Sequence, residues 1–300
     1  MSSYFHVPLV ARIARIDDAA TIRLLNATPS CGRRFGSTGP LLNRWLQRRL
    51  AVDVVTARGA LPAFQPRDDP DRAAQRDALA ARLGRLDADA LAARDDVRAL
   101  GAWVAGDGSE AEGGRRLQTV LGRLFVDEFE ATPATWRAAR LIDRYVRADP
   151  LRAAWWSYSG ALARALRALA EPLADDTHAV HATAIAIHNL HRALATMRAV
   201  RRQPVERARM DEDRIALRCL HAPPSAPRVL EAPTQLPFRA RPAPAGTLVL
   251  FRLADVADGR LDAATTFGEG QWSACPADTY VPALLRAVWR HAVAVPEEAG

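Results

Sequence analysis

The stretch FGEGQWSACP, from Phe267 to Pro276, places a cysteine followed by proline shortly after two glycines spaced two apart. Cys275 is one of only three cysteines in the chain, the others being Cys31 and Cys219. Two interpretations are open. A thiolate at the N-terminus of a helix is stabilised as an anion and can serve as a metal ligand. The glycines alone predict an ordinary turn ahead of a helix.

The composition indicates a globular protein. The chain has 300 residues, of which 49% are hydrophobic and 25% charged, and this length suits one large domain or two modest ones. No apolar run approaches the roughly 18 residues that a membrane helix needs. The N-terminal residues lack the basic flank and apolar block of a signal peptide. We therefore expect a cytoplasmic protein with no membrane partner.

The formal charge of +7 raises the question of a nucleic-acid partner. All 41 basic residues are arginines, and most lie among acids, as in RDDPDRAAQRD. Such mixed segments are typical of a solvated helix surface rather than of a track of phosphate contacts. There is no glycine-rich phosphate loop before a lysine. No CxxC pair predicts a zinc site or a redox dithiol. We expect no nucleic-acid partner and no disulfide framework.

The periodicity of apolar residues predicts a mainly α fold with a small β-sheet. The first thirty residues mix a short β-like run with a short helix, and a helical body follows over about 41–203. Prolines then crowd a segment with short strands at about 204–265, which cannot be one long helix. The cysteine loop and a last helix occupy about 266–294. We read residues 1–300 as a single domain.

Three segments of the helical body carry specific expectations. LLNRWLQRRLAVDVV, residues 41–55, has the apolar spacing of a helix. Thr132 with Pro133 reads as an N-cap followed by proline at the first helical position. HAVHATAIAIHNLHRALATMRAV, residues 178–200, is the longest helical candidate.

Five segments occur in an order that points to one family. They are DPDRAAQR (69–76), AVHATA (179–184), LRCLHAPPSAPRV (217–229), PAGTLVLF (244–251) and FGEGQWSAC (267–275). Together they resemble motifs of the cytochromes P450, taken in that family's order. The resemblance implies a P450-like fold. Because the chain is shorter than a typical member, with the shortfall mostly before Thr183, we expect a fold trimmed before the central helix.

The resemblance also implies haem b as the cofactor. Cys275 would bind its iron. Arg72, Arg76 and Arg228 match the basic positions that hold the haem propionates, and guanidinium groups bind carboxylates in bidentate fashion. On their own, the first two are better explained as surface arginines. Three further positions match the loop that carries the ligand and would contact the cofactor, namely Phe267, Gly268 and Gly270.

Thr183 matches the family's catalytic threonine, whose hydroxyl assists proton delivery. At 100° per residue, Ala179, Val180, Thr183 and Ile187 share one helix face, which is apolar apart from one hydroxyl. Such a face suits a substrate pocket, although it is also typical of a core-facing threonine. Ala182 stands where the family has an acid.

Several positions depart from the family pattern. Ile215 stands three residues before Arg218, where the family has a glutamate, and Glu212 comes one turn too early. Arg218 must therefore find another acid or reach solvent, because an unpaired buried arginine is costly. In the last motif Cys275 comes one residue late, and Trp272 occupies a basic position.

Four histidines, His178, His181, His188 and His191, lie on the predicted central helix. They have no HExxH or ExxH pattern, so we favour packed or surface histidines over a metal site.

The resemblance implies a haem-thiolate monooxygenase that inserts one oxygen atom into a small apolar or amphipathic molecule. Electrons would come from a separate partner, because no flavin or iron–sulfur segment is visible. The positive net charge suits an acidic, ferredoxin-like donor. An alternative is a degenerate P450-like protein without oxygenase activity that acts as a binding or scaffold partner. A third is an unrelated helical protein with chance similarity.

Overall fold

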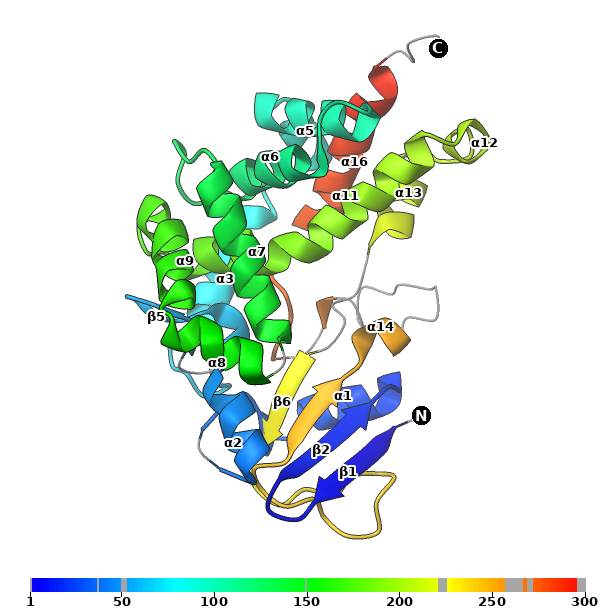
Figure 1. Cartoon of the computed structure of the whole chain (residues 1–300). Helices are drawn as coiled ribbons and strands as arrows, with labels where there is room; N and C mark the ends of the chain where they lie inside the picture. The colour runs from blue at the N-terminus through cyan, green and yellow to red at the C-terminus, as the bar shows by residue number, and fades with distance from the viewer. Residues whose placement is uncertain are drawn as a thin grey trace. The chain divides into compact units, whose positions relative to one another are not determined.

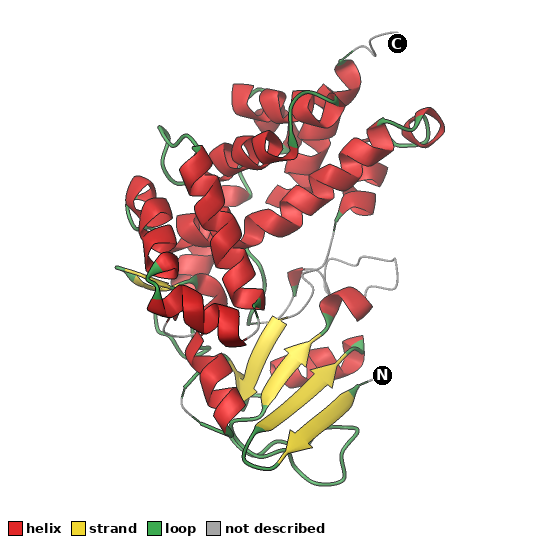
Figure 2. Cartoon of the chain, viewed as in Figure 1, coloured by secondary structure: helices red, strands yellow, loops and turns green. Residues whose placement is uncertain are grey.

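A computed structural model of the chain describes residues 2–36, 38–49, 53–148, 150–220, 226–256, 267–268 and 272–295. The chain forms two compact units. The sheet unit consists of Met1–Gln75 and Ala222–Cys275, and the helical unit consists of Arg76–His221 and Pro276–Gly300. Figure 2 distinguishes the strands from the helices. The fold is mainly α with one small mixed sheet, as the sequence predicts.

Five short strands form the main sheet of the sheet unit. Their order across the sheet is β1 (Ser3–Val7), β2 (Ala11–Ile16), β7 (Leu248–Phe251), β6 (Ala226–Leu230) and β3 (Cys31–Gly32). β2 and β7 run parallel, and the other neighbours are antiparallel. Helix α1 (Ala19–Ala27) contributes Ile22 and Leu25 to the apolar cluster built on Ile16, Val249 and Phe251. This packing confirms the strand and helix expected in the first thirty residues.

Helix α2 (Leu41–Arg48) is tied to the sheet by one buried amide. Asn43 Nδ2 donates to the carbonyls of Arg12 (2.6 Å) and Gly246 (2.8 Å), and Asn43 Oδ1 accepts from the Arg12 N–H. Gly246 has φ of +75° and Gly39 has φ of +95°, and a Cβ on Gly39 would lie 2.5 Å from the Gly246 carbonyl oxygen. Both glycines are therefore required, because the two backbones touch in a conformation that disfavours side chains.

The rest of the sheet unit is short and irregular. Helix α2 ends at Arg48 as an α-helix, Arg49 keeps helical backbone angles, and the expected helix over 41–55 is wrong at its end, where Val55 is not helical. Val55, being β-branched, is instead found in a two-stranded ribbon of β4 (Val55–Thr56) and β5 (Gly59–Ala60). A 3-10 turn (Pro62–Phe64) precedes helix α3 (Arg72–Leu83), which begins in the sheet unit and continues into the helical unit. The short helix α14 (Leu253–Val256) follows β7.

Helices form the helical unit (Figure 1). Its elements are α4 (Ala88–Ala92), α5 (Asp95–Ala105), α6 (Glu110–Gly122), α7 (Pro133–Arg147), α8 (Pro150–Tyr158), α9 (Ala161–Ala170), a 3-10 turn (Glu171–Leu173), α10 (Thr177–His181), a π-helical turn (Ala182–Ala186), α11 (Ile187–Arg201), α12 (Pro204–Arg207), α13 (Glu212–Cys219) and α16 (Tyr280–Ala294). Thr132 caps α7 with Pro133 next, as predicted, and forms a capping box with Thr135.

The long central helix is confirmed as a continuous run from Thr177 to Arg201. Asp176 caps its first turn by accepting from two backbone N–H groups. Its middle turn is π-helical, a feature often found at functional positions. Leu194 and Met197 are fully buried, and α11 packs on α5, α6 and α16. Within the described part of the chain, no helix is long and apolar enough to cross a membrane.

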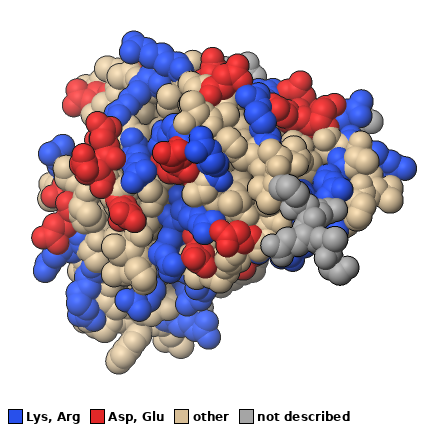
Figure 3. Space-filling model, turned by 90° about the horizontal axis from the view of Figure 1, so that it is seen from above, with Lys and Arg blue, Asp and Glu red and all other residues tan. Residues whose placement is uncertain are grey.

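Surface charge follows the mixed pattern of the sequence. Figure 3 shows arginines interspersed with aspartates and glutamates over one face. Ion pairs account for part of this mixture, such as Arg98 with Asp95 (2.9 Å) and Arg286 with Asp213 (2.7 Å). On the face that is shown, charges of opposite sign are neighbours, which is typical of a solvated surface.

Candidate functional site

Four arginines of the sheet unit surround the indole of Trp272. The guanidinium carbons of Arg72, Arg33, Arg228 and Arg67 lie 5.0, 5.2, 5.5 and 5.7 Å from the centre of its ring. We call these four residues the arginine cluster. All four distances fall within the range of cation–π attraction. Trp272 therefore gathers four positive charges that come from separate parts of the sequence.

The sheet and the start of α3 position the two most buried members. Arg228 lies in β6 and is 3% exposed. Its guanidinium donates to Asn26 Oδ1 (3.3 Å), the Pro227 carbonyl (2.9 Å) and Ser273 Oγ (3.0 Å). Arg72 is the first residue of α3 and donates to the Pro62 carbonyl at 3.1 Å. The guanidiniums of Arg228 and Arg72 thus both donate to backbone carbonyls next to the sheet and to α3.

The electrostatics of the cluster are unbalanced. Burial, and then the charges of Arg228 and Arg72, hold the pKa of Arg33 well below its usual value. Burial also lowers the pKa of Arg228 to about 10. No carboxylate of the described residues forms an ion pair with Arg33, Arg67 or Arg228, and the buried Arg33 Nε has no hydrogen-bond partner among them. Buried cations without counterions are costly, so this cluster is suited to an anion.

The cysteine loop lies in the same unit. The Cys275 N–H donates to the Phe267 carbonyl at 2.7 Å, which joins the two ends of the stretch. Gly268 has φ of +66°, a conformation that requires glycine here. Phe267 is buried, whereas Gly270 lies outside the described residues. Helix α16 begins only at Tyr280, after a turn, so Cys275 is not the residue that opens that helix.

Cys275 differs from the other two cysteines. It is exposed and forms no disulfide, and its charge acts on Arg33. Cys31 and Cys219 are buried, and burial raises the pKa of each thiol to about 12. Cys275 is therefore the cysteine whose thiolate is accessible and lies near a cation. A thiolate in a partly exposed, electropositive setting is the form that binds metals.

These residues fit a dicarboxylate cofactor with a metal that accepts a thiolate. The observation that tests the fit is the partnerless Arg33 Nε, a buried donor beside three further guanidiniums. Carboxylates supply the acceptors that such donors need. Trp272 also lies within cation–π distance of these guanidiniums. Arg33, Arg67 and Trp272 were not predicted as site residues, although CGRRFG does place an arginine pair without acids between two glycines.

Two predicted site residues belong to the helical unit. Thr183 is fully buried in the π-helical turn, where its hydroxyl donates to the Ala179 carbonyl at 2.7 Å. Its own carbonyl accepts from Gln118 Nε2 at 3.1 Å. Val180 and Ile187 are buried with it, as the shared helix face predicts. Arg76 forms an ion pair with Asp77 at 2.8 Å and is part of α3.

The structure shows which acid pairs with Arg218, which lacks the glutamate expected three residues before it. Arg218 is exposed and pairs with Glu206 at 2.8 Å, which confirms that it needs another acid or solvent. Glu212, one turn early, instead receives two hydrogen bonds of 2.9 Å from Arg290 on α16. The acid–arginine bridge of α13 is therefore formed with a different partner.

The histidines of the central helix behave as packed aromatic groups. His191 stacks on Trp103 with ring centres 5.5 Å apart, and His188 lies 5.8 Å from Trp136. Among the described residues, no three metal-ligating side chains lie together.

Known proteins resemble this chain in structure but not in sequence. No protein-family profile matches the chain. No curated protein matches its sequence. Among solved structures, a 6-coordinated cytochrome P450 from Thermus thermophilus is 17% identical with a TM-score of 0.55, and the match covers 93% of this chain and 85% of that one.

Two further solved structures give similar agreement. Cytochrome P450-153 from Novosphingobium aromaticivorans has a TM-score of 0.56 at 12% identity, covering 96% of this chain and 84% of that chain. The myxobacterial cytochrome P450 CYP267B1, solved with myristic acid, has a TM-score of 0.56 at 16% identity, covering 97% and 84%. At such identities the likeness concerns the fold. The chain therefore has a P450-like fold.

Proposed function

We propose that this protein is a haem-thiolate monooxygenase. The observation that carries the proposal is the arginine cluster beside Cys275, in which no described residue gives Arg33, Arg67 or Arg228 a carboxylate ion pair. Arg33, Arg67, Arg72 and Arg228 would hold the two propionates of haem b, and Cys275 would bind its iron. When bound, the haem activates dioxygen for insertion of one oxygen atom into a small apolar or amphipathic substrate.

The chain's own residues would then perform three tasks. The arginine cluster orients the anionic edge of the cofactor through charge-assisted hydrogen bonds. Gly268 closes the cysteine loop without a side chain. Thr183 carries a proton on its hydroxyl at the π-helical turn, with Val180 and Ile187 as apolar neighbours. Arg76 is a further candidate for a propionate contact, provided that it leaves Asp77.

Electrons would come from a separate partner. An acidic, ferredoxin-like protein fits the net charge of +7.

A second candidate function rests on Trp272. Its indole already lies within cation–π distance of all four arginines. This packing compensates part of the charge of the arginine cluster. The chain would then be a haem-free, P450-like binding or scaffold protein.

One spectroscopic experiment separates the two. The protein is expressed with a haem precursor, and the reduced, carbon-monoxide-bound spectrum is recorded for wild type, Cys275→Ser and Cys219→Ala. The monooxygenase proposal expects one haem per chain and a strongly red-shifted Soret band that Cys275→Ser abolishes and Cys219→Ala retains. Wild-type protein that folds normally and takes up no haem would reject it in favour of the second candidate.

A further inference from the structure

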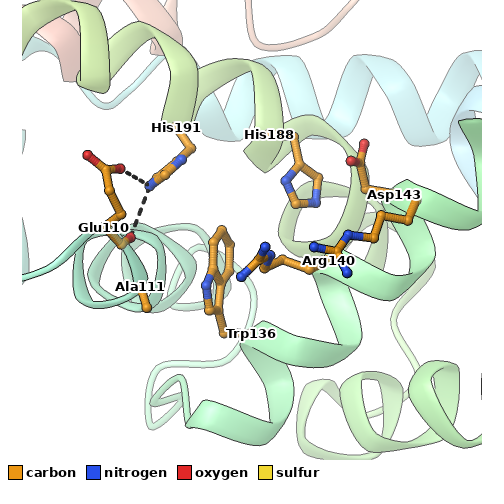
Figure 4. A pocket seen from close by; sticks show the side chains of 8 residues that line it. Glu110, Ala111, Trp136, Arg140, Asp143, His188 and His191 are labelled. Atoms are coloured by element: carbon orange, nitrogen blue, oxygen red, sulfur yellow. Dashed lines mark hydrogen bonds and ion pairs between the residues drawn. The ribbon is translucent and has the colours of Figure 1, made fainter.

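A second candidate site lies wholly within the helical unit. An open cavity of about 350 Å³ is lined by the start of α6, one face of α7 and the middle of α11. Trp136, Arg140 and Arg144 follow one another at four-residue spacing along α7, and His188 and His191 lie on α11. Figure 4 shows side chains from all three helices directed to the same space. The volume is within the range of small-molecule sites.

Aromatic rings form one wall of the cavity. The centre of the Trp136 ring lies 5.5 Å from that of His191 and 5.8 Å from that of His188. The benzene edge of Trp136 rests on Gly114 of α6, where a Cβ would come within 2.2 Å of the ring. The indole is therefore fixed in place and 6% exposed. Such a wall suits a flat ring of a ligand.

The polar groups without partners at the cavity are all donors. The buried Trp136 Nε1 has no hydrogen-bond partner in the described part of the chain. The guanidiniums of Arg140 and Arg144 form no ion pair or hydrogen bond with any described residue, and the charge of Arg140 acts on His191. A buried N–H without a partner costs free energy, so an acceptor is expected to join it.

The acceptors and imidazoles around the cavity already have partners. The His191 Nε2 lies 3.3 Å from the Glu110 carbonyl oxygen and 3.6 Å from the Glu110 carboxylate. The His188 Nε2 lies 3.3 Å from the Ala139 carbonyl. Asp143 also has a partner. A ligand is therefore offered two guanidiniums and an indole N–H, which together select an anion.

We propose that the cavity between α6, α7 and α11 binds a small aromatic carboxylate. The carboxylate accepts from Arg140 and Arg144, one turn apart on the same helix face, in the bidentate geometry that guanidinium favours. The ring of the ligand packs on Trp136, with the indole N–H as a third donor. The site uses no residue of the arginine cluster and does not depend on haem.

The test measures binding of 2-naphthoate and of its uncharged analogue 2-naphthamide by isothermal titration calorimetry. Wild-type protein is expected to bind naphthoate at least about tenfold more tightly than naphthamide, because only the carboxylate uses the arginines. Arg140→Gln/Arg144→Gln is expected to weaken naphthoate binding about tenfold or more and to leave naphthamide binding little changed. Equal affinity for the two probes would overturn the proposal.

Two control variants test whether naphthoate binds in this cavity. Arg167→Gln removes an exposed guanidinium from α9, outside the cavity, and is expected to bind naphthoate as wild type does. Arg33→Gln changes the arginine cluster and is expected to do the same, which separates this site from that of the proposed function. Unchanged naphthoate affinity in the Arg140/Arg144 double variant, or an equal loss in Arg33→Gln, would also overturn the proposal.

A third variant addresses the indole N–H. Trp136→Phe keeps an aromatic wall and removes the donor, so naphthoate affinity is expected to fall several-fold while helical circular dichroism is retained. If this variant unfolds, the arginine double variant still decides the outcome, because Arg140 and Arg144 are exposed and their substitution is expected to leave the core intact.

Discussion

The guanidinium carbon of Arg72 lies 5.0 Å from the centre of the Trp272 ring. The first residue of α3 therefore contacts the cysteine loop through the indole of Trp272. The sequence places these residues 200 positions apart. Trp272 stands where the resemblance expects a basic residue, and its π face attracts the cations that such a residue would repel. The substitution therefore stabilises the cluster through cation–π contacts, while the Arg33 Nε has no hydrogen-bond partner among the described residues.

The first prediction concerns Arg33 in the haem-free protein. Arg33→Gln removes a partly buried charge whose pKa is depressed by burial and by Arg228 and Arg72. We expect its melting temperature to stay the same or to rise by about 2–4 °C. Arg228→Gln should instead lower the melting temperature, because three hydrogen bonds are lost. Differential scanning calorimetry measures both.

The same variants should respond differently to haem. If the cluster holds the propionates, Arg33→Gln weakens haem binding about tenfold in a titration, since one charge-assisted contact is removed. Arg23→Gln, which removes an exposed arginine of α1, is the matched control and should titrate as wild type. A melting temperature that falls as far in Arg33→Gln as in Arg228→Gln would contradict the electrostatic account of the cluster.

The second prediction concerns thiol reactivity. Cys275 is exposed, whereas burial raises the pKa of Cys31 and Cys219 to about 12. Only the thiolate reacts, so at pH 8 a disulfide reagent should modify one cysteine rapidly in native protein and all three in urea. Mass spectrometry of the peptides should locate the fast site at Cys275. Rapid modification of Cys31 in the native protein would show that its core position is wrong.

Bound haem should protect that cysteine. If Cys275 binds the iron, pre-incubation with haem slows its modification at least about tenfold, because its thiolate is then coordinated and unavailable to the reagent. The control is zinc protoporphyrin added to Cys275→Ser, for which no fast site should remain in either state. Haem that binds stoichiometrically and leaves Cys275 fully reactive would place the iron elsewhere.

Local patterns explain which parts of the fold could be predicted. The cap Thr132–Pro133 and the helix over 178–200 follow from side-chain chemistry and spacing within one segment, and both are found. The prediction of a helix over 41–55 is wrong at Val55, because the pairing of Val55 with Ala60 depends on a strand that the spacing does not reveal. Tertiary contacts decide such short β segments.

The residues of the candidate site also divide into those that local motifs predict and those that only tertiary contacts reveal. Arg72, Arg228 and Cys275 could be named because they sit in motifs with a recognisable order. Arg33 and Arg67 could not, because their role appears only when β3, β6 and the loop before α3 meet at Trp272. The cavity on α7 was missed for a similar reason. The sequence places its histidines on one helix. That Trp136 and Arg140 lie near them follows only from the packing of α7 beside α11.

The third prediction concerns the bridge between α13 and α16. Arg290 donates to both carboxylate oxygens of Glu212 at 2.9 Å and to Asp89 at 2.7 Å. Arg286 on the same helix makes a single exposed pair with Asp213. Arg290→Gln should reduce the free energy of unfolding by about 1 kcal/mol and Arg286→Gln by no more than about 0.5 kcal/mol. Urea titrations at low salt measure the difference.

Salt provides the check on this interpretation. Ion pairs at a surface are screened, so the gap between the two variants should shrink in 1 M sodium chloride, where the Debye length is about 3 Å. Equal losses for Arg290→Gln and Arg286→Gln at low salt would mean that the two-acid bridge adds nothing beyond one pair.

The last prediction concerns His191 and acid stability. Burial lowers the pKa of His191, and the charge of Arg140 acts in the same direction, although Glu110 opposes both. The rings of Trp103 and Trp136 cover its other sides. The unfolded chain therefore binds a proton at a higher pH than the folded chain does. Stability should be fully present above the ordinary value of about 6.5 and should fall as pH drops below it.

His191→Gln should make this dependence shallower. We expect the slope of unfolding free energy against pH between 5 and 7 to decrease in His191→Gln. A remaining slope is expected from His178, whose pKa burial also lowers, and His178→Gln/His191→Gln should reduce the slope further. Arg167→Gln changes an exposed residue of α9, leaves every histidine in place and serves as the control. A slope as steep in the double variant as in wild type would mean that these histidines are solvated in the folded protein.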